Sequence, residues 1–293
     1  MNEHDSLADR FEAQRPHLRA VAFRMLGSTS EAEDAVQETW MRLDRTDRAD
    51  IVNLGGWLRT VVSNVCLDML RSRRARREEL VGEQVPDRSS PVGQETPERE
   101  VILVDEVGRA LLVVLDALTP AERVAFVLHE TFAVPFAEIA PIVGRSPVAA
   151  KKLASRARRK VRGTPSVSGA ELAEHRQLVE AFLAAARSGD VTGVVAVLAP
   201  DVVRVADRAA LSAGRATEVS GAQAVAEEIA GFGRNARFAE PALVNGAVGL
   251  VVAPHGRLLL ALAITVEGTK IARYELIGDP ARLRSLELAV LDT

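Results

Sequence analysis

The sequence contains a single cysteine, Cys66, among its 293 residues. One thiol cannot form an internal disulfide, and neither a CxxC pair nor an HExxH motif supplies the spacing of metal ligands. A structural zinc is therefore not expected, and no cofactor is predicted. Aromatic residues make up only 4% of the chain. Alanine, leucine, valine and arginine are abundant instead, which favours a mostly helical first half.

Long hydrophobic runs are also missing. No apolar stretch approaches the roughly 18 residues that a membrane span requires. The opening residues, MNEHDSLADR, have neither the basic region nor the apolar region of a secretory signal. We therefore expect a cytoplasmic protein with no membrane partner. With 47% hydrophobic residues, the chain has ample material for packed cores.

The chain has no overall excess of positive charge, since its formal net charge is −3. This argues against a generally basic nucleic-acid coat. The charge is nevertheless unevenly distributed: residues 145–162 carry eight basic and no acidic side chains, whereas residues 78–106 carry nine acidic and two basic ones. The acidic stretch also contains Pro86, Pro91 and Pro97, so it is typical of a solvated linker between folded domains.

Hydrophobic periodicity and these linkers divide the chain into three domains, two all-α and one α+β. The predicted segments are a first helical domain at 1–77, an acidic flexible linker at 78–104, a second helical domain at 105–162, a short linker at 163–169 and an α+β domain at 170–293. The predicted helices are 7–27, 30–46, 52–77, 103–118, 120–131, 135–143, 147–162, 170–188 and 190–199. The predicted strands are 249–253, 258–266 and 270–277.

The helix at 30–46 has two contrasting faces. A capping box formed by Ser30 and Glu33 predicts where it begins. Alanines, Val36 and Leu43 follow the helical repeat on one face. The opposite face is acidic with a hydrophobic edge, and its members are Asp34, Gln37, Glu38 and Met41. Taken alone, such a face is more typical of an ordinary solvated helix surface, and only its context favours a functional role.

The helix at 52–77 ends in a cluster of arginines. Asn64, Asp68 and Arg71 lie along its polar stripe, and Arg73, Arg74, Arg76 and Arg77 complete a cluster of five arginines. Clustered guanidinium groups repel one another unless a polyanion neutralises them, and this favours a nucleic-acid partner. Asn64 is a residue type that pairs with a base, while Asp68 is placed to orient a neighbouring arginine. The alternative is a basic helix end favoured by the helix dipole, which explains one or two arginines more easily than five.

Residues 135–162 form a predicted helix-turn-helix. Gly144 marks the turn, Ser146 is the predicted N-cap and Pro147 takes the first helical position. A stripe of alanines and Val161 packs one side of the second helix, while its other faces are basic. Such a helix suits the major groove of DNA. The alternative of a membrane-surface helix is disfavoured because the alanine stripe is weakly apolar.

Pro141 lies inside the first helix of this motif. It removes one backbone hydrogen bond and should cost about 3 kcal/mol in a regular helix interior. A kinked or shortened helix is therefore expected.

Four motifs in order now carry a resemblance: residues 31–40 (EAEDAVQETW), 56–71 (GWLRTVVSNVCLDMLR), 118–128 (LTPAERVAFVL) and the helix-turn-helix. Together they resemble the extracytoplasmic-function (ECF) sigma factors over about residues 8–162. The resemblance implies that Asp34, Gln37, Glu38 and Met41 bind the clamp helices of the bacterial RNA polymerase core. It also implies a DNA-binding set that reads the minus-ten and minus-thirty-five promoter elements. Its members are Asn64, Asp68, Arg71, Arg73, Arg74, Ser146, Ala149, Lys151, Lys152, Ser155, Arg156 and Arg159.

The third domain resembles the SnoaL-like, cone-shaped α+β domain that one subgroup of these sigma factors carries. The resemblance implies that this domain modulates sigma activity in cis through contact with the sigma domains. Asp207, His255 and Tyr274 are candidates for a C-terminal pocket. His255 lies between a proline and a glycine, which are typical of a turn, and Tyr274 lies in a predicted strand. An active enzyme is therefore not expected.

Two other functions remain open from the sequence. The chain could be a ligand-responsive helix-turn-helix regulator that binds DNA without polymerase. Less favoured is a SnoaL-type enzyme with a DNA-binding appendage, whose turnover would depend on Asp207 or His255.

Overall fold

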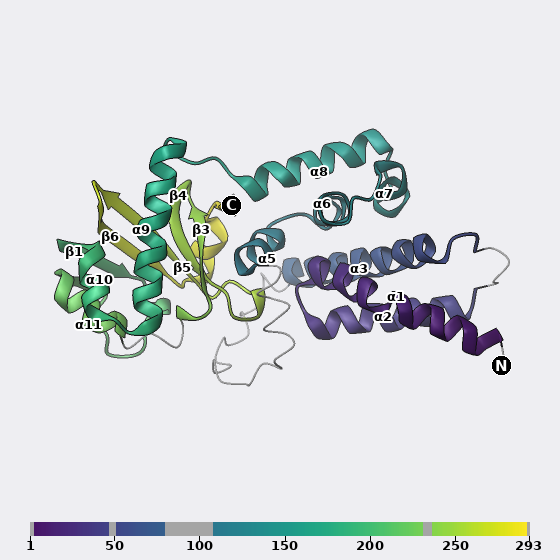
Figure 1. Cartoon of the computed structure of the whole chain (residues 1–293), viewed down its shortest axis with the longest axis horizontal. Helices are drawn as coiled ribbons and strands as arrows, with labels where there is room; N and C mark the ends of the chain where they lie inside the picture. Colours follow the sequence, from purple (N-terminus) through teal and green to yellow (C-terminus); the bar gives the residue numbers. More distant parts are fainter. Residues whose placement is uncertain (1–2, 47–50, 80–107, 231–235, 292–293) are drawn as a thin grey trace. The chain divides into compact units, whose positions relative to one another are not determined.

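The computed structural model describes residues 3–46, 51–79, 108–230 and 236–291 (Figure 1). Contacts divide the chain into two compact units. The first comprises Met1–Leu103 and Leu115–Arg158, and the second comprises Val104–Val114 and Arg159–Thr293. Of the segment predicted to be an acidic flexible linker, 78–104, all but the first two residues lie outside the described residues.

Three helices open the first unit: α1 (Glu3–Leu26), α2 (Thr29–Asp44) and α3 (Leu54–Glu79). Each packs against the other two, burying Phe11, Leu18 and Leu58 to at most 1% exposure. All three helices were predicted within a few residues. The predicted capping box at Ser30 is wrong, because α2 starts earlier and the hydroxyl of Ser28 accepts the first hydrogen bond of the cap.

The helices that follow are α5 (Arg109–Asp116), α6 (Pro120–Phe126), the π-helical turn η3 (Val127–Thr131), α7 (Phe136–Val143) and the longer α8 (Pro147–Arg162). Gly144 adopts a φ of 65° at the end of α7, a conformation that glycine reaches without strain. The hydroxyl of Ser146 accepts a hydrogen bond from the Ala149 N–H at 3.3 Å. The predicted helix-turn-helix is therefore confirmed. Pro141 lies inside α7, which continues for two residues beyond it and ends at Gly144.

Within the first unit, α3 packs against α6 and α7, and α1 packs against η3. Arg59 of α3 forms an ion pair with Glu138 of α7 at 2.7 Å. Phe132 receives the edge of the His17 ring, with 5.3 Å between centroids, and the guanidinium of Arg24 at 5.4 Å. Loss of water around His17, followed by the nearby charge of Arg59, lowers the pKa of the imidazole. The two helical groups therefore share one packed unit.

The second unit is built on a seven-stranded mixed sheet of order β2-β1-β6-β5-β4-β3-β7. Its strands are β1 (Leu198–Ala206), β2 (Glu218–Ser220), β3 (Ala239–Val244), β4 (Ala247–Val252), β5 (Leu260–Glu267), β6 (Lys270–Ile277) and β7 (Leu288–Ala289). Neighbouring strands run antiparallel except β1 and β6, which are parallel. The β1–β6 pair makes the sheet mixed, as an α+β domain allows.

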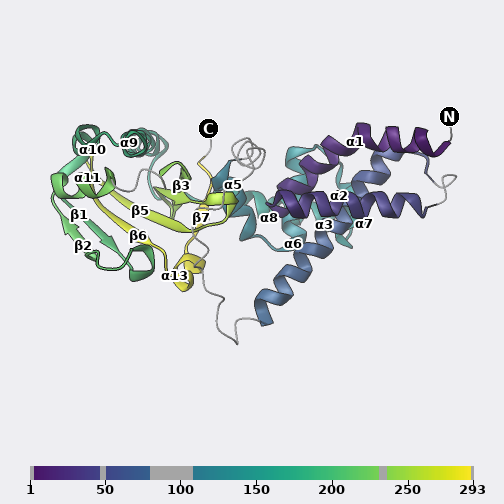
Figure 2. The same ribbon diagram turned by 90° about the horizontal axis from the view of Figure 1, so that it is seen from below.

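Helices α9 (Gly169–Ser188), α10 (Val191–Val197) and α11 (Ala222–Ala230) lie together on one side of the sheet (Figure 2). Val179 and Phe182 of α9, Val225 of α11, and Ile271 and Tyr274 of β6 form the centre of the core between these layers. The remaining short helices are η4 (Arg208–Ala210), η5 (Pro254–Gly256) and α13 (Pro280–Ser285).

Strand β4 is apolar on both faces, which accounts for the unbroken run Gly249-Leu-Val-Val-Ala253. Leu250 and Val252 join the core under α9. Val251 points to the other face, since successive side chains of a strand alternate. There it packs with Ala242 of β3 and with Ala110 from the first half of α5.

Candidate functional site

The exposed face of α2 carries the polar set predicted to contact polymerase. Asp34, Gln37 and Met41 are exposed, and Met41 shows 44% of its surface to solvent. Glu38 is half-buried and pairs with Arg42 at 2.9 Å. Within the described parts of the chain, no hydrogen bond or ion pair engages the Asp34 carboxylate. This face therefore presents one unneutralised acid beside an exposed thioether.

The polar stripe of α3 is open along part of its length. Asn64 is half-buried, while Asp68 and Arg71 are exposed and lie 3.6 Å apart. The prediction that Asp68 orients a neighbouring arginine is thus consistent with the geometry. Arg74 is exposed as well.

Arg73 has a different environment from its neighbours. Its guanidinium pairs with Glu31 of α2 and donates to the Leu26 carbonyl at 3.2 Å. The side chain is only 19% exposed. In the structure these donors tie α3 to α1 and α2, and the DNA contact of Arg73 stays a prediction.

Helix α8 presents the basic surface predicted from the sequence. Ala150, Ala154 and Ala157 are buried at 1% exposure or less, and Val161 at 7%. The opposite side is solvent-exposed and carries Lys151, Lys152, Ser155, Arg156 and Arg159, with Ser146 at the helix start and the half-buried Ala149 beside it.

Two further residues of this motif were not singled out from the sequence. Val148 is 68% exposed at the N-terminal end of α8, where an apolar side chain can contact a thymine methyl group. The signal that could have found it is its place outside the alanine stripe. Arg158, by contrast, pairs with Glu130 at 2.5 Å, and this interaction raises its pKa.

The three residues predicted for a C-terminal pocket do not lie together. Tyr274 lines a cavity of the sheet domain, and Asp207 and His255 do not. The carboxylate of Asp207 accepts hydrogen bonds from the backbone N–H groups of Ala210, Gly278 and Asp279. It therefore holds two loops together.

His255 sits in the η5 turn with a φ of 55°. The prediction that His255 lies in a turn is confirmed. Neither Asp207 nor His255 lines the cavity, so the structure does not group these two residues with Tyr274.

Sequence reasoning missed a buried ion pair beside that cavity. Arg204 of β1 is fully buried, and its guanidinium makes three hydrogen bonds to the carboxylate of Glu228, the shortest at 2.5 Å, and one to the Ala216 carbonyl at 2.8 Å. Arg215 also reaches Glu228, at 3.3 Å. An arginine in a strand that alternates with apolar residues is the signal that could have indicated it, since buried charges require partners.

Comparison with known proteins identifies the family. Residues 10–76 match the family described as Sigma-70 region 2, and residues 108–161 match Sigma-70, region 4. The chain is 40% identical over 288 residues to the ECF RNA polymerase sigma factor SigJ of Mycobacterium tuberculosis, an alignment covering 92% of this chain and 91% of the relative. The chain belongs to the ECF RNA polymerase sigma factors.

This sigma factor is also 35% identical over 290 residues to the probable ECF RNA polymerase sigma factor SigI of Mycobacterium tuberculosis, with 98% of each chain covered. A crystal structure of SigJ covers 94% of the sigma factor and 97% of its own chain at 32% identity, with a TM-score of 0.41. Both relatives match beyond region 4, so the C-terminal sheet domain belongs to the shared architecture. Their names describe sigma factors rather than enzymes.

Membership of the family defines the activity of this ECF sigma factor. It binds the RNA polymerase core and promoter DNA and directs the initiation of transcription. None of the helices in the described part of the chain is long and apolar enough to cross a membrane. Nor do the described residues contain a cluster of histidine, cysteine or acidic side chains that could hold a metal ion.

One contact of this sigma factor joins a matched region to the appended domain within the second unit. The N–H of Arg109, at the start of α5, donates to the carboxylate of Glu240 on β3 at 2.6 Å. The Arg109 guanidinium also lies 5.8 Å from the centroid of the Phe238 ring. Leu112 packs so closely on Gly256 that a Cβ at that glycine would meet it at 2.6 Å. The first half of the first region 4 helix is thus held by the sheet domain.

Proposed function

We propose that this sigma factor recognises both promoter elements through two helices and is regulated in cis by its C-terminal domain. In this proposal α8 reads the minus-thirty-five element in the major groove. Asn64, Asp68 and Arg71 of α3 read and melt the minus-ten element. The exposed face of α2 docks on the clamp helices of the polymerase core, which carries out catalysis. The protein acts in the cytoplasm, where polymerase and chromosome meet.

The single observation that carries this proposal is the composition of the outer side of α8. Over 16 residues, or about 24 Å of helix, it exposes lysines and arginines above a buried row of alanines. A helix of this width enters the major groove, and the exposed cations neutralise phosphates with release of counterions. Ser146 and Ala149, at the N-terminal end of α8, lie where base edges are read.

The α2 proposal is supported by the pairing of its acids. Glu31 and Glu33 are neutralised by arginines of the same bundle, and Glu38 is paired with Arg42. Asp34 retains its charge for a partner. An unpaired acid next to the exposed Met41 favours a protein surface that is basic and partly apolar.

The packing of the first unit supports a resting state that must open on promoters. The two elements lie about 25 base pairs apart, or about 85 Å of B-form DNA. Helix α3 contacts α7, and α7 connects to α8 through the turn at Gly144. With α3 and α8 about 39 and 24 Å long, their reading residues cannot be separated that far while this contact persists. We infer that the contact breaks when both elements are bound.

Regulation in cis is supported by the contact of α5 with the sheet. The contact includes a hydrogen bond, a cation–aromatic contact and the close approach of Leu112 to Gly256. A domain that packs against the first helix of region 4 can restrict how that region moves. In this way the sheet domain would set how readily the chain adopts its promoter-binding form.

The test is run-off transcription with the purified full chain and core polymerase on genomic promoter fragments. We expect a product that requires both proteins and that is lost when the minus-thirty-five element is scrambled. Absence of a core-dependent product on every promoter would overturn the proposal. Tight promoter binding by the chain alone, unaltered by core polymerase, would favour a stand-alone regulator instead.

A further inference from the structure

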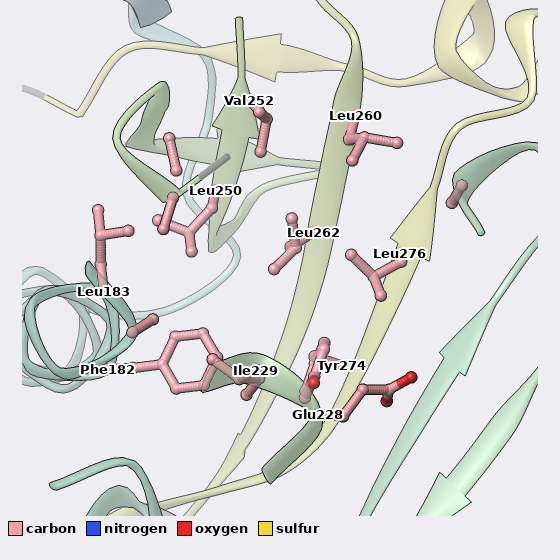
Figure 3. Close-up of a pocket in the computed structure, with 14 residues that line it drawn as sticks. Phe182, Leu183, Glu228, Ile229, Leu250, Val252, Leu260, Leu262, Tyr274 and Leu276 are labelled. Carbon is pink, nitrogen blue, oxygen red and sulfur yellow. The ribbon is translucent and has the colours of Figure 1, made fainter. Parts of the chain in front are cut away.

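The sheet domain contains a cavity between α9, α11 and the sheet (Figure 3). Its volume is about 80 Å³, and it is partly open to solvent; an enclosed apolar cavity of about 150 Å³ holds a benzene molecule. Its walls are almost wholly apolar: Phe182 and Leu183 come from α9, Leu250 from β4, and Leu262 from β5. A site of this kind favours an apolar occupant over water.

The cavity wall contains one hydroxyl without a partner. Tyr274 is 3% exposed, and its ring lies 5.8 Å from that of Phe182. No hydrogen bond joins its hydroxyl to any other residue in the described ranges. Burial raises the pKa of this phenol, so it stays protonated at neutral pH and can both donate and accept. A buried hydroxyl is unfavourable unless a ligand or water bonds it.

The other polar side chain in the wall is already satisfied. Glu228 is held by Arg204 and Arg215, and this pair keeps its carboxylate from acting on a ligand. Figure 3 shows the Glu228 carboxylate turned outward from the apolar side chains that surround the cavity. Among the described residues that line the cavity there is no cationic side chain. A charged ligand would therefore lose its hydration without compensation.

We propose that this cavity binds a small neutral molecule that is apolar except for one hydroxyl or carbonyl oxygen, which hydrogen-bonds Tyr274. The apolar part packs against Phe182 and the leucines. The single oxygen completes the hydrogen bond that the protein leaves unmade. Simple phenols have this polarity.

The cavity shares two strands with the contact that holds α5. Ala239 of β3, and Leu250 and Val252 of β4, line the cavity. Ala242 and Val251 of the same strands pack on the opposite face with α5. A ligand that shifts these strands would therefore reach the first helix of region 4. This regulatory consequence rests on the proposed function, whereas binding itself does not.

Binding can be located because Tyr274 is the only tyrosine in the chain. Full-length protein labelled with carbon-13 at the tyrosine ring gives one set of ring signals by NMR. We expect p-cresol at millimolar concentration to shift that signal, with toluene as the matched probe that lacks the hydroxyl. No shift with either compound would overturn the proposal.

Affinities measured by calorimetry then test the hydrogen bond. We expect p-cresol to bind more tightly than toluene, and Tyr274→Phe to weaken p-cresol by about two- to tenfold while leaving toluene unchanged. If Tyr274→Phe lowers the affinity for both compounds equally, the Tyr274 hydroxyl does not contribute to recognition. This substitution keeps the ring that packs against Phe182, so the fold is preserved.

A cavity-filling pair of variants tests the location. Ala186 lines the cavity from α9, whereas Ala184 is exposed on the same helix. Ala186→Leu should abolish binding of both compounds, and Ala184→Leu should not. Unchanged binding in Ala186→Leu would place the ligand elsewhere. Failed binding would leave promoter-directed transcription intact, and failed transcription would leave binding intact, so the two proposals fail separately.

Discussion

At the residue scale, Asp34 differs from Glu31, Glu33 and Glu38 of its helix because no arginine neutralises it. An exposed interface charge acts mainly through long-range attraction, which salt screens. Asp34→Asn should weaken binding of the polymerase core by about three- to tenfold at low salt and less at high salt. The unfolding free energy should change by less than about 0.5 kcal/mol, since the side chain is exposed.

The measurement is a binding titration with core polymerase at two salt concentrations. Asp9→Asn is the matched control, because Asp9 is exposed on α1 and loses the same charge. If both variants weaken binding equally, net charge rather than the α2 face is responsible.

Cys66 makes the stability of the first helical bundle depend on pH. Burial raises the pKa of its thiol from 9.0 to about 12, while the charge of Arg123 partly opposes the shift. Between these values the unfolded chain has released the proton and the folded chain keeps it. The unfolding free energy should therefore fall as pH rises above 9, by about 1 kcal/mol from pH 8 to 10.

Urea unfolding followed by tryptophan fluorescence measures this effect, because both tryptophans, Trp40 and Trp57, lie on helices of that bundle. In Cys66→Ala the decline over the same pH range should be smaller. An identical decline in both proteins would show that other groups cause it.

At the scale of elements, α8 offers arginines in two environments. Arg156 and Arg159 are exposed, whereas Arg158 is held by Glu130. Arg156→Ala and Arg159→Ala should each weaken promoter binding and reduce the slope of log affinity against log salt by about 1. Arg158→Ala, the control, should leave the slope nearly unchanged. Fluorescence anisotropy at several salt concentrations measures this slope. If the slope is unaltered in the first two variants, Arg156 and Arg159 do not contact DNA.

The packing of α5 on the sheet depends on a glycine. A Cβ at Gly256, where φ is +69°, would lie 2.6 Å from a methyl carbon of Leu112. Gly268 has a similar φ of +59° and open space around it. Gly256→Ala should therefore speed hydrogen exchange in α5 by on the order of tenfold, whereas Gly268→Ala imposes the backbone strain alone. Equal exchange in the two variants would show that the Leu112 contact does not hold α5.

At the scale of the whole molecule, the first unit joins residues of both sigma regions, and one ion pair marks the contact. Arg59→Glu or Glu138→Arg should raise the ratio of open to closed forms by up to about fivefold, since such a pair contributes at most about 1 kcal/mol. The double exchange should restore the original ratio. If the double exchange does not restore the ratio of open to closed forms, charge effects other than this ion pair are responsible.

Spin labels at the exposed positions Ser72 and Ser155, placed in Cys66→Ala protein, measure the distance distribution. The single variants should gain a population at long distance. Distances that are the same in all four proteins would contradict the proposed opening.

Much of this architecture was predictable because the sequence signals of a helix all lie within a short stretch of the chain. The alanine stripe of α8, the Ser146 cap and the glycine turn all lie within 20 residues of sequence, and they were confirmed. Strands β1 and β3 were missed. Strand β1 contains Pro200 and Asp201, which are unfavourable in strands, and its pairing with β6 changes register after Leu198. Its partner lies some 70 residues away, so no local pattern specifies it.

The sequence by itself determined the sigma-factor organisation: the periodicity of the helices, the concentration of positive charge in α8 and the unusual acidic face of α2. Only the tertiary structure decided which charges remain available. It paired Arg73 with Glu31, Arg158 with Glu130 and Arg204 with Glu228, and it left the hydroxyl of Tyr274 facing a cavity. The reason is physical: a residue's type sets what it can bind, but residues distant in sequence decide whether that capacity is already used.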